Sequence, residues 1–293
     1  MNVDKSMLEQ LHRILKEKTG TAAQIRTVIP VGGGSINHAY QLQTTAGSFF
    51  LKTRPDAPPS FFEREAEGLQ LLHKAGAQVP AVFAVTSTFL LLEWIPKGQW
   101  TSSRMRALGR QLALVHQSQQ PFYGLKNDNY IGLLPQSNRL REDWPTFFRE
   151  QRLGPQYQSA LSGGKIHPRS KRAKQMEQLL NRLEEWLPLN PPAALLHGDL
   201  WSGNVLPALD GRNLLIDPAV YWGHHEVDLA FSQYFGGFST DFYEGYAEIS
   251  PLDPNFEDRK PIYQLYYILV HLNLFGEAYG PAVDAVLNRY VGG

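Results

Sequence analysis

Cysteine is absent from all 293 residues of the chain. Its absence excludes a disulfide framework, a zinc site with thiolate ligands and a cysteine nucleophile. The chain also lacks any run of about 18 apolar residues, so the sequence predicts no membrane-spanning helix. The first 20 residues have neither the continuous apolar core nor the cleavage site of a signal peptide. We therefore expect a cytoplasmic protein that does not act at a membrane.

An excess of charge of either sign is absent too. Lys plus Arg total 28 and Asp plus Glu total 28, so the formal net charge is zero. A balanced chain has no global positive field that would attract nucleic acid, and the basic cluster at 169–174 is typical of an exposed helix start. We expect a small-molecule partner and no nucleic acid. The sequence leaves a monomer and a homodimer both open.

The apolar residues, 43% of the chain, change their spacing along the sequence. Near the N-terminus, short apolar runs bounded by turn residues predict five strands and two amphipathic helices, whereas the later spacing is mostly helical. The pattern indicates an α+β protein with a sheet lobe at 1–95 and a mostly helical lobe at 96–293. The predicted strands are 25–29, 39–42, 48–51, 82–85 and 89–93; the predicted helices are 7–15, 61–74, 102–117, 144–161, 170–186, 227–234 and 262–275.

The motif HGDLWSGN, which follows an apolar run, is the strongest chemical signal. It contains Asp199 and, five positions later, Asn204. In phosphoryl transfer an Asp at this place accepts the proton of the attacking hydroxyl, and the Asn coordinates Mg²⁺. Asp217 follows a second apolar run and offers another oxygen ligand for the metal. Each residue alone suits an ordinary turn, but the combined spacing favours a kinase.

A lysine and a glutamate in the first lobe complete the set. Lys52 ends a predicted strand, where its ammonium could neutralise the α- and β-phosphates of ATP. Glu65 lies in the next predicted helix and could hold Lys52 through an ion pair. Glu63 and Glu67 are rivals for that role, and we prefer Glu65 because it lies toward the buried side of the helix. Alone, each residue could equally be solvent-exposed.

Two backbone segments are candidates for nucleotide contacts. Gly32, Gly33, Gly34 and Ser35 lie between two predicted strands, where backbone amides could approach phosphate oxygens. The segment is neither a Walker loop nor a dinucleotide fingerprint, and a plain hairpin is an equal alternative. At the expected linker, the backbone of Glu93, Trp94 and Ile95 could pair with an adenine edge.

Aromatic and acidic residues near the two motifs are candidates for the acceptor side. Trp201, Trp222 and Glu226 could contact a sugar ring or a cationic amine, although the aromatics could equally pack the helical lobe. Nearby polar residues have structural interpretations instead. We expect Asp228 to hydrogen-bond the backbone of the Asp199 turn, His197 to brace that turn, and His116 to be a satisfied core histidine. We expect His224 and His225 to be structural or exposed.

The motifs taken together resemble the fructosamine kinase family. The segments are GGGSINHAY, FFLKT, FEREAEGL, LLEWIP, HGDLWSGNVL and IDPAVYWGHHEVDLAF, and the resemblance runs from about residue 10 to the C-terminus. The family lies in the wider group of enzymes similar to aminoglycoside phosphotransferases and choline kinases. HGDLWSGN followed by IDPAVYWG is typical of the family, whereas the Asp and Asn alone mark only the wider group.

The resemblance implies a bilobal protein-kinase-like fold with a five-stranded antiparallel sheet. It implies transfer of the ATP γ-phosphate, with Mg²⁺, to a sugar hydroxyl of a glycated amine. By the same resemblance, Asp199 matches the catalytic base, Asn204 and Asp217 match the metal ligands, and Lys52 and Glu65 match the phosphate-anchoring pair. Asp217 stands in Ile-Asp-Pro and not in the Asp-Phe-Gly of protein kinases, which argues against a protein Ser or Thr hydroxyl as acceptor.

Two other functions remain as alternatives. An aminoglycoside- or choline-kinase-like enzyme would favour a strongly acidic acceptor pocket, for which Glu226 and Asp228 are thin support. A pseudokinase that binds nucleotide without catalysis is disfavoured, because all five residues that phosphoryl transfer needs are present: Lys52, Glu65, Asp199, Asn204 and Asp217.

Overall fold

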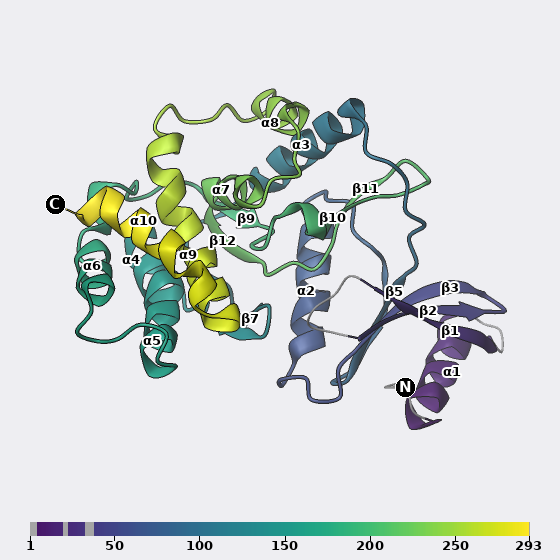
Figure 1. The fold of residues 1–293 in the computed structure, drawn as a ribbon. Helices are drawn as coiled ribbons and strands as arrows, with labels where there is room; N and C mark the ends of the chain where they lie inside the picture. Colours follow the sequence, from purple (N-terminus) through teal and green to yellow (C-terminus); the bar gives the residue numbers. More distant parts are fainter. Residues whose placement is uncertain (1–4, 20–22, 33–37, 293) are drawn as a thin grey trace. The chain divides into compact units, whose positions relative to one another are not determined.

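The computed structural model describes residues 5–19, 23–32 and 38–292. Contacts within the chain divide it into two compact units. The first comprises Met1–Trp100 and Leu206–Asp217, and the second comprises Thr101–Val205 and Pro218–Gly293. The division of the lobes at residue 95 stays a prediction, and the contacts of 206–217 lie with the first unit. Figure 1 shows the elements of each unit.

A five-stranded antiparallel sheet forms the first unit, as the sequence predicts. The strand order is β1-β2-β3-β5-β4. Two helices accompany the sheet in this unit, and both were predicted. The elements are α1 (Lys5–Thr19), β1 (Ile25–Val31), β2 (His38–Thr44), β3 (Gly47–Thr53), α2 (Phe61–Lys74), β4 (Val82–Val85) and β5 (Phe89–Glu93).

The alternation of side chains along β3 separates its two faces. Phe49 and Leu51 join the buried cluster that Met7, Leu11 and Leu15 of α1 form against the sheet. Because successive side chains of a strand point to opposite faces, Lys52 points away from that cluster. The strand therefore presents a lysine on the face opposite α1.

A hairpin from later in the sequence completes the first unit. It consists of β10 (Val205–Pro207) and β11 (Asn213–Leu215). The amide of Gly98 donates to the carbonyl of Pro207 at 2.7 Å, and the amide of Leu215 donates to the carbonyl of Gln78 at 2.9 Å. These bonds place Asp217, two residues after β11, in the same unit as Lys52.

The second unit is built around α9 (Phe256–Phe275), which buries residues on all sides. A helix that is apolar all round lies in the core of a helical unit. Figure 1 shows α4, α5, α7 and α10 around it. Its helices are α3 (Ser102–His116), α4 (Trp144–Phe148), α5 (Gly154–Ser162), α6 (Lys171–Leu180), α7 (Glu226–Tyr234), α8 (Thr240–Ala247), α9 and α10 (Gly280–Val291), with a π-helical stretch at Arg149–Leu153 and short 3₁₀ stretches at Leu183–Glu185, Ser202–Asn204 and Glu277–Tyr279.

Short strands in the second unit position the polar motifs. The antiparallel order β12-β9-β6 combines β12 (Tyr221–His224), β9 (Ala193–Leu196) and β6 (Gln119–Gln120). A second pair joins β7 (Asn129–Ile131) to β8 (Leu134–Gln136). Strand β9 leads directly into HGDLWSGN, so the apolar run at 193–196 anchors that motif.

The structure adds elements that the sequence analysis did not predict. Helices α8 and α10 and strand β12 were missed, and α9 begins six residues before the predicted 262. Glycine explains part of the packing of α8, because a Cβ on Gly245 would lie 2.1 Å from the carbonyl oxygen of Arg106 in α3. Such close approach depends on the partner helix and leaves no periodic signal in the sequence.

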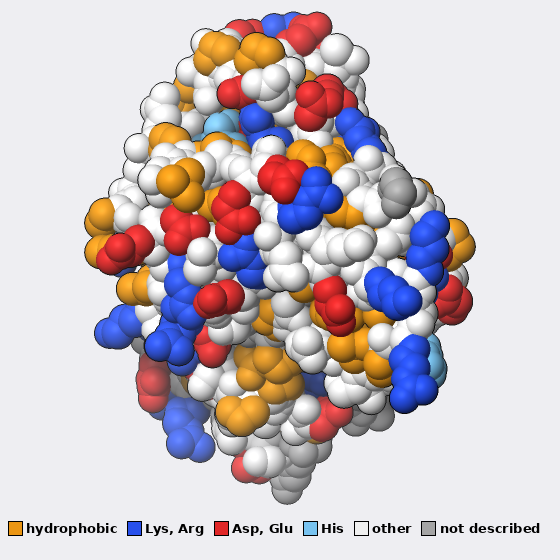
Figure 2. Space-filling model, turned by 90° about the vertical axis from the view of Figure 1, so that its left-hand side faces the viewer, with side chains coloured by type: hydrophobic (Ala, Val, Ile, Leu, Met, Phe, Trp, Pro, Cys, Tyr) orange, Lys and Arg blue, Asp and Glu red, His pale blue; other side chains and the backbone are white. Residues whose placement is uncertain are grey.

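Within the part of the chain that the structure describes, no helix is long and apolar enough to cross a membrane. On the face that Figure 2 shows, basic and acidic side chains are interspersed with small apolar areas. The local charge on this face therefore follows the balanced composition of the chain.

Candidate active site

The loop 197–204 places Asp199 beside Asn204. The Nδ2 group of Asn204 donates to the Asp199 carboxylate at 2.9 Å and to the Asp199 carbonyl at 2.8 Å. Asn204 is buried, whereas Asp199 is half-buried. The amide therefore orients the carboxylate while leaving part of it exposed.

A buried acid holds the start of the loop. Asp228 is fully buried in α7 and accepts hydrogen bonds from the amides of His197 at 2.7 Å and Gly198 at 2.9 Å. The ring of His116 lies 3.2 Å from the same carboxylate and 2.8 Å from the hydroxyl of Tyr246. The predictions for Asp228 and His116 are confirmed. His197 also braces the turn as predicted, since its Nδ1 accepts from the Asp199 amide at 3.2 Å.

Tyr267 supports the same turn and was missed by the sequence analysis. Its buried hydroxyl donates to the carbonyl of Gly198 at 2.8 Å. Gly198 has a φ of 79°, and a Cβ there would lie 2.1 Å from the carbonyl oxygen of Ala219. Only glycine fits both the left-handed backbone and this close approach. The aromatic-rich pattern around residue 267 signalled only a core helix.

Trp201 lies at the surface of the second unit, next to the loop's glycine. Trp201 is 38% exposed. A Cβ on Gly203 would lie 2.2 Å from its indole ring. The glycine thus lets the indole lie close over the loop backbone. Trp222 is half-buried in β12, where its backbone pairs with Gly124 at 2.9 Å in both directions.

In the first unit, Lys52 lies between two carboxylates. Its Nζ contacts Glu65 at 2.7 Å and also forms an ion pair with Asp217. The expected pairing with Glu65 is confirmed, and the side chain of Lys52 is only 8% exposed. Burial alone would lower the pKa of Lys52, but the carboxylates of Asp217 and Glu65 outweigh it and raise that pKa. Burial raises the pKa of Glu65, against the opposing effect of Lys52.

Asp217 combines an unusual backbone with an exposed carboxylate. Its φ is 55°, a left-handed conformation that non-glycine residues seldom adopt. Such conformations cost about 1–3 kcal/mol and cluster at functional sites. Its side chain is 44% exposed, although one carboxylate oxygen contacts Lys52.

Asn204 in the second unit and Asp217 in the first unit each have an oxygen atom of the kind that a hard divalent cation binds. Among the described residues, both hydrogen bonds of the Asn204 side chain use Nδ2, so its carbonyl oxygen is available as a ligand. The second carboxylate oxygen of Asp217 is the corresponding donor in the first unit. Mg²⁺ prefers such oxygen ligands. Each residue taken by itself therefore offers the type of ligand that the expected Mg²⁺ prefers.

The structure describes only part of the two segments that are expected to contact nucleotide. Gly33, Gly34 and Ser35 lie outside the described residues, and Gly32 has open space where a Cβ would be. The linker is better defined. The Glu93 carboxylate pairs with Arg212 of the hairpin at 2.5 Å, and Ile95 is buried against Ala208 and Leu214.

Trp94 and Glu226 complete the set of predicted site residues. The ring centroids of Trp94 and Phe50 lie 6.3 Å apart. Glu226 is fully buried, and Arg259 donates to both of its carboxylate oxygens, at 2.8 and 2.5 Å. This ion pair occupies the carboxylate and gives Glu226 a structural role, so we withdraw it as an acceptor contact.

His224 and His225 also have structural surroundings. Burial lowers the pKa of His225 to about 3 and that of His224 well below its ordinary value. The hydroxyl of Tyr263 lies 2.8 Å from Nδ1 of His224. These histidines come close to Glu226, but the guanidinium of Arg259 holds that carboxylate and disfavours a metal there.

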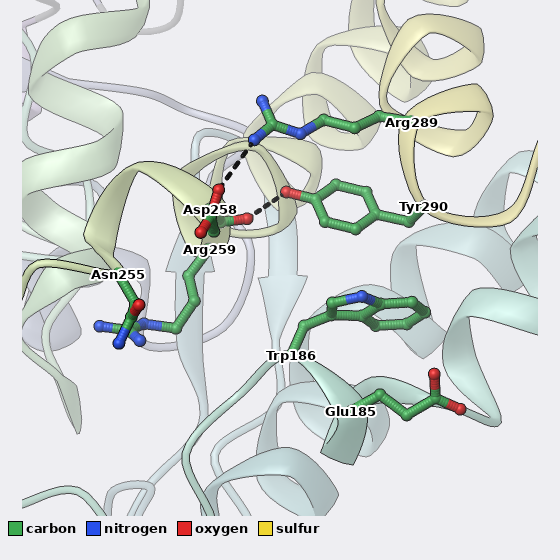
Figure 3. A pocket seen from close by; sticks show the side chains of 7 residues that line it. All are labelled: Glu185, Trp186, Asn255, Asp258, Arg259, Arg289 and Tyr290. Carbon is green, nitrogen blue, oxygen red and sulfur yellow. Dashed lines mark hydrogen bonds and ion pairs between the residues drawn. The ribbon is translucent and has the colours of Figure 1, made fainter.

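A separate cavity of about 490 Å³ lies in the second unit. Figure 3 shows Trp186 and Tyr290 on one side of it and Arg259 and Asn255 on the other. Asp258 contacts Arg289 and Tyr290 at its upper edge. The lining includes none of the residues predicted to act on ATP, metal or acceptor, so we do not assign the cavity to the active site.

Comparisons with known proteins agree with these motifs. The chain is 42% identical over 269 residues to a probable ketoamine kinase of Enterococcus faecium, covering 90% of this chain and 95% of the relative. It is 37% identical over 283 residues to a chloroplastic protein-ribulosamine 3-kinase of Oryza sativa, covering 93% and 81%.

A solved structure matches both the fold and the sequence. The crystal structure of a fructosamine-3-kinase homologue from Thermobifida fusca has a TM-score of 0.85 and 34% identity, covering 95% of this chain and 98% of that one. The kinase-like α+β fold expected from the sequence is confirmed. The family model for fructosamine kinase matches residues 7–292, and the chain therefore belongs to the fructosamine kinase family.

Proposed function

We propose that this enzyme transfers the γ-phosphoryl group of ATP to a sugar hydroxyl of a glycated amine, a ketoamine. The observation that carries the proposal is the pairing of Asp199 with Asn204 in a loop whose backbone is held by the buried Asp228. A general base needs a fixed direction and access to the reacting hydroxyl. The names of the relatives, ketoamine and ribulosamine kinases, support the class of acceptor.

Asp199 acts on the acceptor. Its carboxylate accepts the proton of the sugar hydroxyl as the hydroxyl oxygen bonds to the γ-phosphorus. The bond between that phosphorus and the β,γ-bridging oxygen breaks, and ADP leaves. Asn204 keeps the carboxylate oriented through the 2.9 Å hydrogen bond. Most of the catalytic effect is then positioning and charge stabilisation.

Lys52 acts on ATP. Its charge, which Glu65 and Asp217 stabilise in the folded protein, neutralises the phosphates of the nucleotide. Asn204 of the second unit and Asp217 of the first unit would each offer an oxygen ligand for Mg²⁺. With Mg²⁺ bound, the charge that builds on the phosphate oxygens would be partly neutralised.

The acceptor class is tested with a panel of substrates. Purified enzyme with Mg²⁺ and ATP is offered fructosyl-lysine, ribosyl-lysine, an aminoglycoside, choline and a serine peptide, and ADP release and the phosphorylated product are both measured. We expect a ketoamine to have the highest kcat/KM. If the aminoglycoside or choline is the best acceptor, or if none is phosphorylated, the proposal is wrong.

Asp199 is tested with the nearly isosteric Asp199→Asn. An amide cannot accept the hydroxyl proton, so we expect turnover to fall by roughly two to four orders of magnitude while ATP affinity and Tm stay close to wild type. Asp241→Asn, in the first turn of α8 and outside the proposed site, is the matched control. Near-normal turnover of Asp199→Asn would remove Asp199 from the role of base.

A further inference from the structure

A row of aromatic rings extends from the loop 197–204 over the second unit. Trp201 contacts Phe235 with ring centroids 6.1 Å apart, and Phe235 contacts His271 at 5.1 Å. His271 in turn contacts Phe275 at 5.6 Å and Tyr279 at 5.0 Å. We call these residues, Trp201, Phe235, His271, Phe275 and Tyr279, the aromatic strip.

Three rings of the strip are exposed to solvent, and the other two, His271 and Tyr279, are half-buried. Trp201 is 38% exposed, Phe235 44% and Phe275 57%. Single large apolar side chains at the surface are common, but exposed rings that ring contacts join into one group indicate a binding surface. The strip starts two residues after Asp199, so it is continuous with the proposed acceptor site.

The strip rests on the same residue that holds the loop. Phe235 contacts the buried Phe231 at 5.8 Å, and Phe231 stacks on Tyr267 with centroids 3.6 Å apart. The Tyr267 hydroxyl donates to Gly198. The rings are therefore a rigid continuation of the loop that positions Asp199.

Two segments that carry rings of the strip have no formal charge, although Glu277 lies two residues before Tyr279 and Asp199 lies two residues before Trp201. The segments 234–239 and 271–276 contain no Lys, Arg, Asp or Glu. Burial lowers the pKa of His271, so its ring is neutral near pH 7. Its Nδ1 donates to the carbonyl of Tyr267 at 2.7 Å, which leaves Nε2 as a hydrogen-bond acceptor. The surface suits an apolar or aromatic group with an occasional donor.

We propose that the aromatic strip binds the peptide segment that carries the glycated lysine and selects carriers with an aromatic residue near that lysine. The inference rests on the proposed function, since it assigns the amine side of the same acceptor. A sugar at Trp201 leaves the lysine arm and the neighbouring residues to Phe235, His271 and Phe275.

The dimensions of a peptide agree with this assignment. An extended chain advances roughly 3.4 Å per residue, so the steps of 5–6 Å between rings correspond to one or two residues each. If the lysine arm spans the first step, the two remaining steps reach about two to four residues from the modified lysine. Ring faces also attract the secondary ammonium of a ketoamine. A free glycated amino acid would leave the outer rings unused.

The test uses two glycated peptides that differ at one position. Both contain a single fructosyl-lysine, and the residue two places away is Phe in one and Glu in the other. Fructosyl-glycine serves as the small reference acceptor. The kcat/KM of each is measured for wild type, for Phe235→Ala, for Phe275→Ala and for Leu189→Ala. Leu189 is 58% exposed in the same unit and lies outside the strip, so it is the matched control.

We expect wild type to prefer the Phe peptide to the Glu peptide, and each strip substitution to reduce that preference by roughly three- to tenfold, as the loss of one aromatic contact implies. Leu189→Ala should keep the wild-type preference. If fructosyl-glycine is phosphorylated but the two peptides react equally, or the strip variants keep the preference, the strip assignment is wrong and the proposed function stands. If no glycated acceptor is phosphorylated, the proposed function itself fails.

A second copy of the chain could cover the strip in place of a peptide, and the oligomeric state distinguishes these two occupants. Sedimentation of wild type and Phe275→Ala is compared at the same concentrations. We expect the same species for both proteins. A dimer that Phe275→Ala dissociates would mean that the strip is an interface between copies, which would overturn the peptide assignment.

Discussion

Lys52 shows how one residue depends on two acidic neighbours. Its ammonium is nearly buried, and Glu65 and Asp217 raise its pKa despite that burial. A raised lysine pKa stabilises the fold at every pH below the unfolded value of about 10.4, and this stabilisation disappears as the pH rises through the folded value. Lys52 therefore stays charged over the whole physiological range, as phosphate binding requires.

Replacing Glu65 with glutamine tests whether that pair serves nucleotide binding. Glu65→Gln keeps a hydrogen bond to Lys52 but removes the charge, which weakens the contact by about 1 kcal/mol. We expect kcat/KM for ATP to fall about five- to tenfold. The control is Glu67→Gln, whose carboxylate pairs with Arg64 at the surface. If Glu65→Gln and Glu67→Gln have the same kinetics, the charged pair between Lys52 and Glu65 is not needed for nucleotide binding.

His225 gives a prediction about acid stability. Burial lowers its pKa to about 3, whereas an unfolded histidine titrates near 6.5. The unfolded state then binds the proton first, so stability is full above about pH 6.5 and falls as the pH drops toward the folded value. His224 acts in the same direction.

Urea unfolding at pH 7.0 and at pH 5.5 measures this effect. We expect His225→Gln to lose about 1 kcal/mol less stability between the two values than wild type does. His12→Gln, in the first unit, is a control histidine on α1. An unchanged pH dependence in His225→Gln would show that folding leaves the pKa of His225 near its unfolded value.

At the scale of elements, the loop 197–204 is held directly by two helices and indirectly by a third. Asp228 of α7 holds its first amides, Tyr267 of α9 holds the carbonyl of Gly198, and His116 of α3 contacts Asp228. None of these helices is adjacent to the loop in the sequence. The geometry of Asp199 thus depends on how the helical unit packs.

Gly198→Ala tests the closeness of that packing. The new Cβ would lie 2.1 Å from the carbonyl oxygen of Ala219, in a backbone with a φ of 79°. We expect a loss of more than about 2 kcal/mol in unfolding free energy, because the backbone itself must move. Gly164→Ala is the matched control, since its φ is 66° and a Cβ there meets open space. That control should lose only about 1 kcal/mol. Similar losses in both variants would mean that the loop adapts to the extra methyl group.

At the scale of the whole molecule, ligand binding should couple Mg²⁺ to ATP through Asp217. A ligand at about 100 times its Kd stabilises the folded protein by about 2.7 kcal/mol, which appears as a rise in Tm. We expect ATP to raise the Tm more with Mg²⁺ than with EDTA. Asp217→Ala should remove this difference, because it removes the carboxylate ligand.

Asp210→Ala is the control for that experiment, because Asp210 is an exposed acid of the same hairpin that pairs with Arg212. It should keep the full effect of Mg²⁺. A Tm difference that survives in Asp217→Ala would place the metal site elsewhere.

The sequence by itself determined the elements and the chemistry that local spacing encodes. Apolar alternation predicted all five strands of the sheet, and helical spacing selected Glu65 over Glu63 and Glu67 as the partner of Lys52. The spacing of HGDLWSGN identified the Asp199–Asn204 pair that the structure brings together. These features depend on residues that are near one another in the chain, so their pattern is visible without a fold.

Only the tertiary structure decided which distant side chains meet. Glu226 looked like an acceptor contact until Arg259, 33 residues away, was found paired with it in the core. The bond from Tyr267 to Gly198 spans 69 residues, and the aromatic strip joins the loop 197–204 to α7 and α9. Such contacts depend on the packing of whole helices, and periodicity within one segment carries no information about its partners.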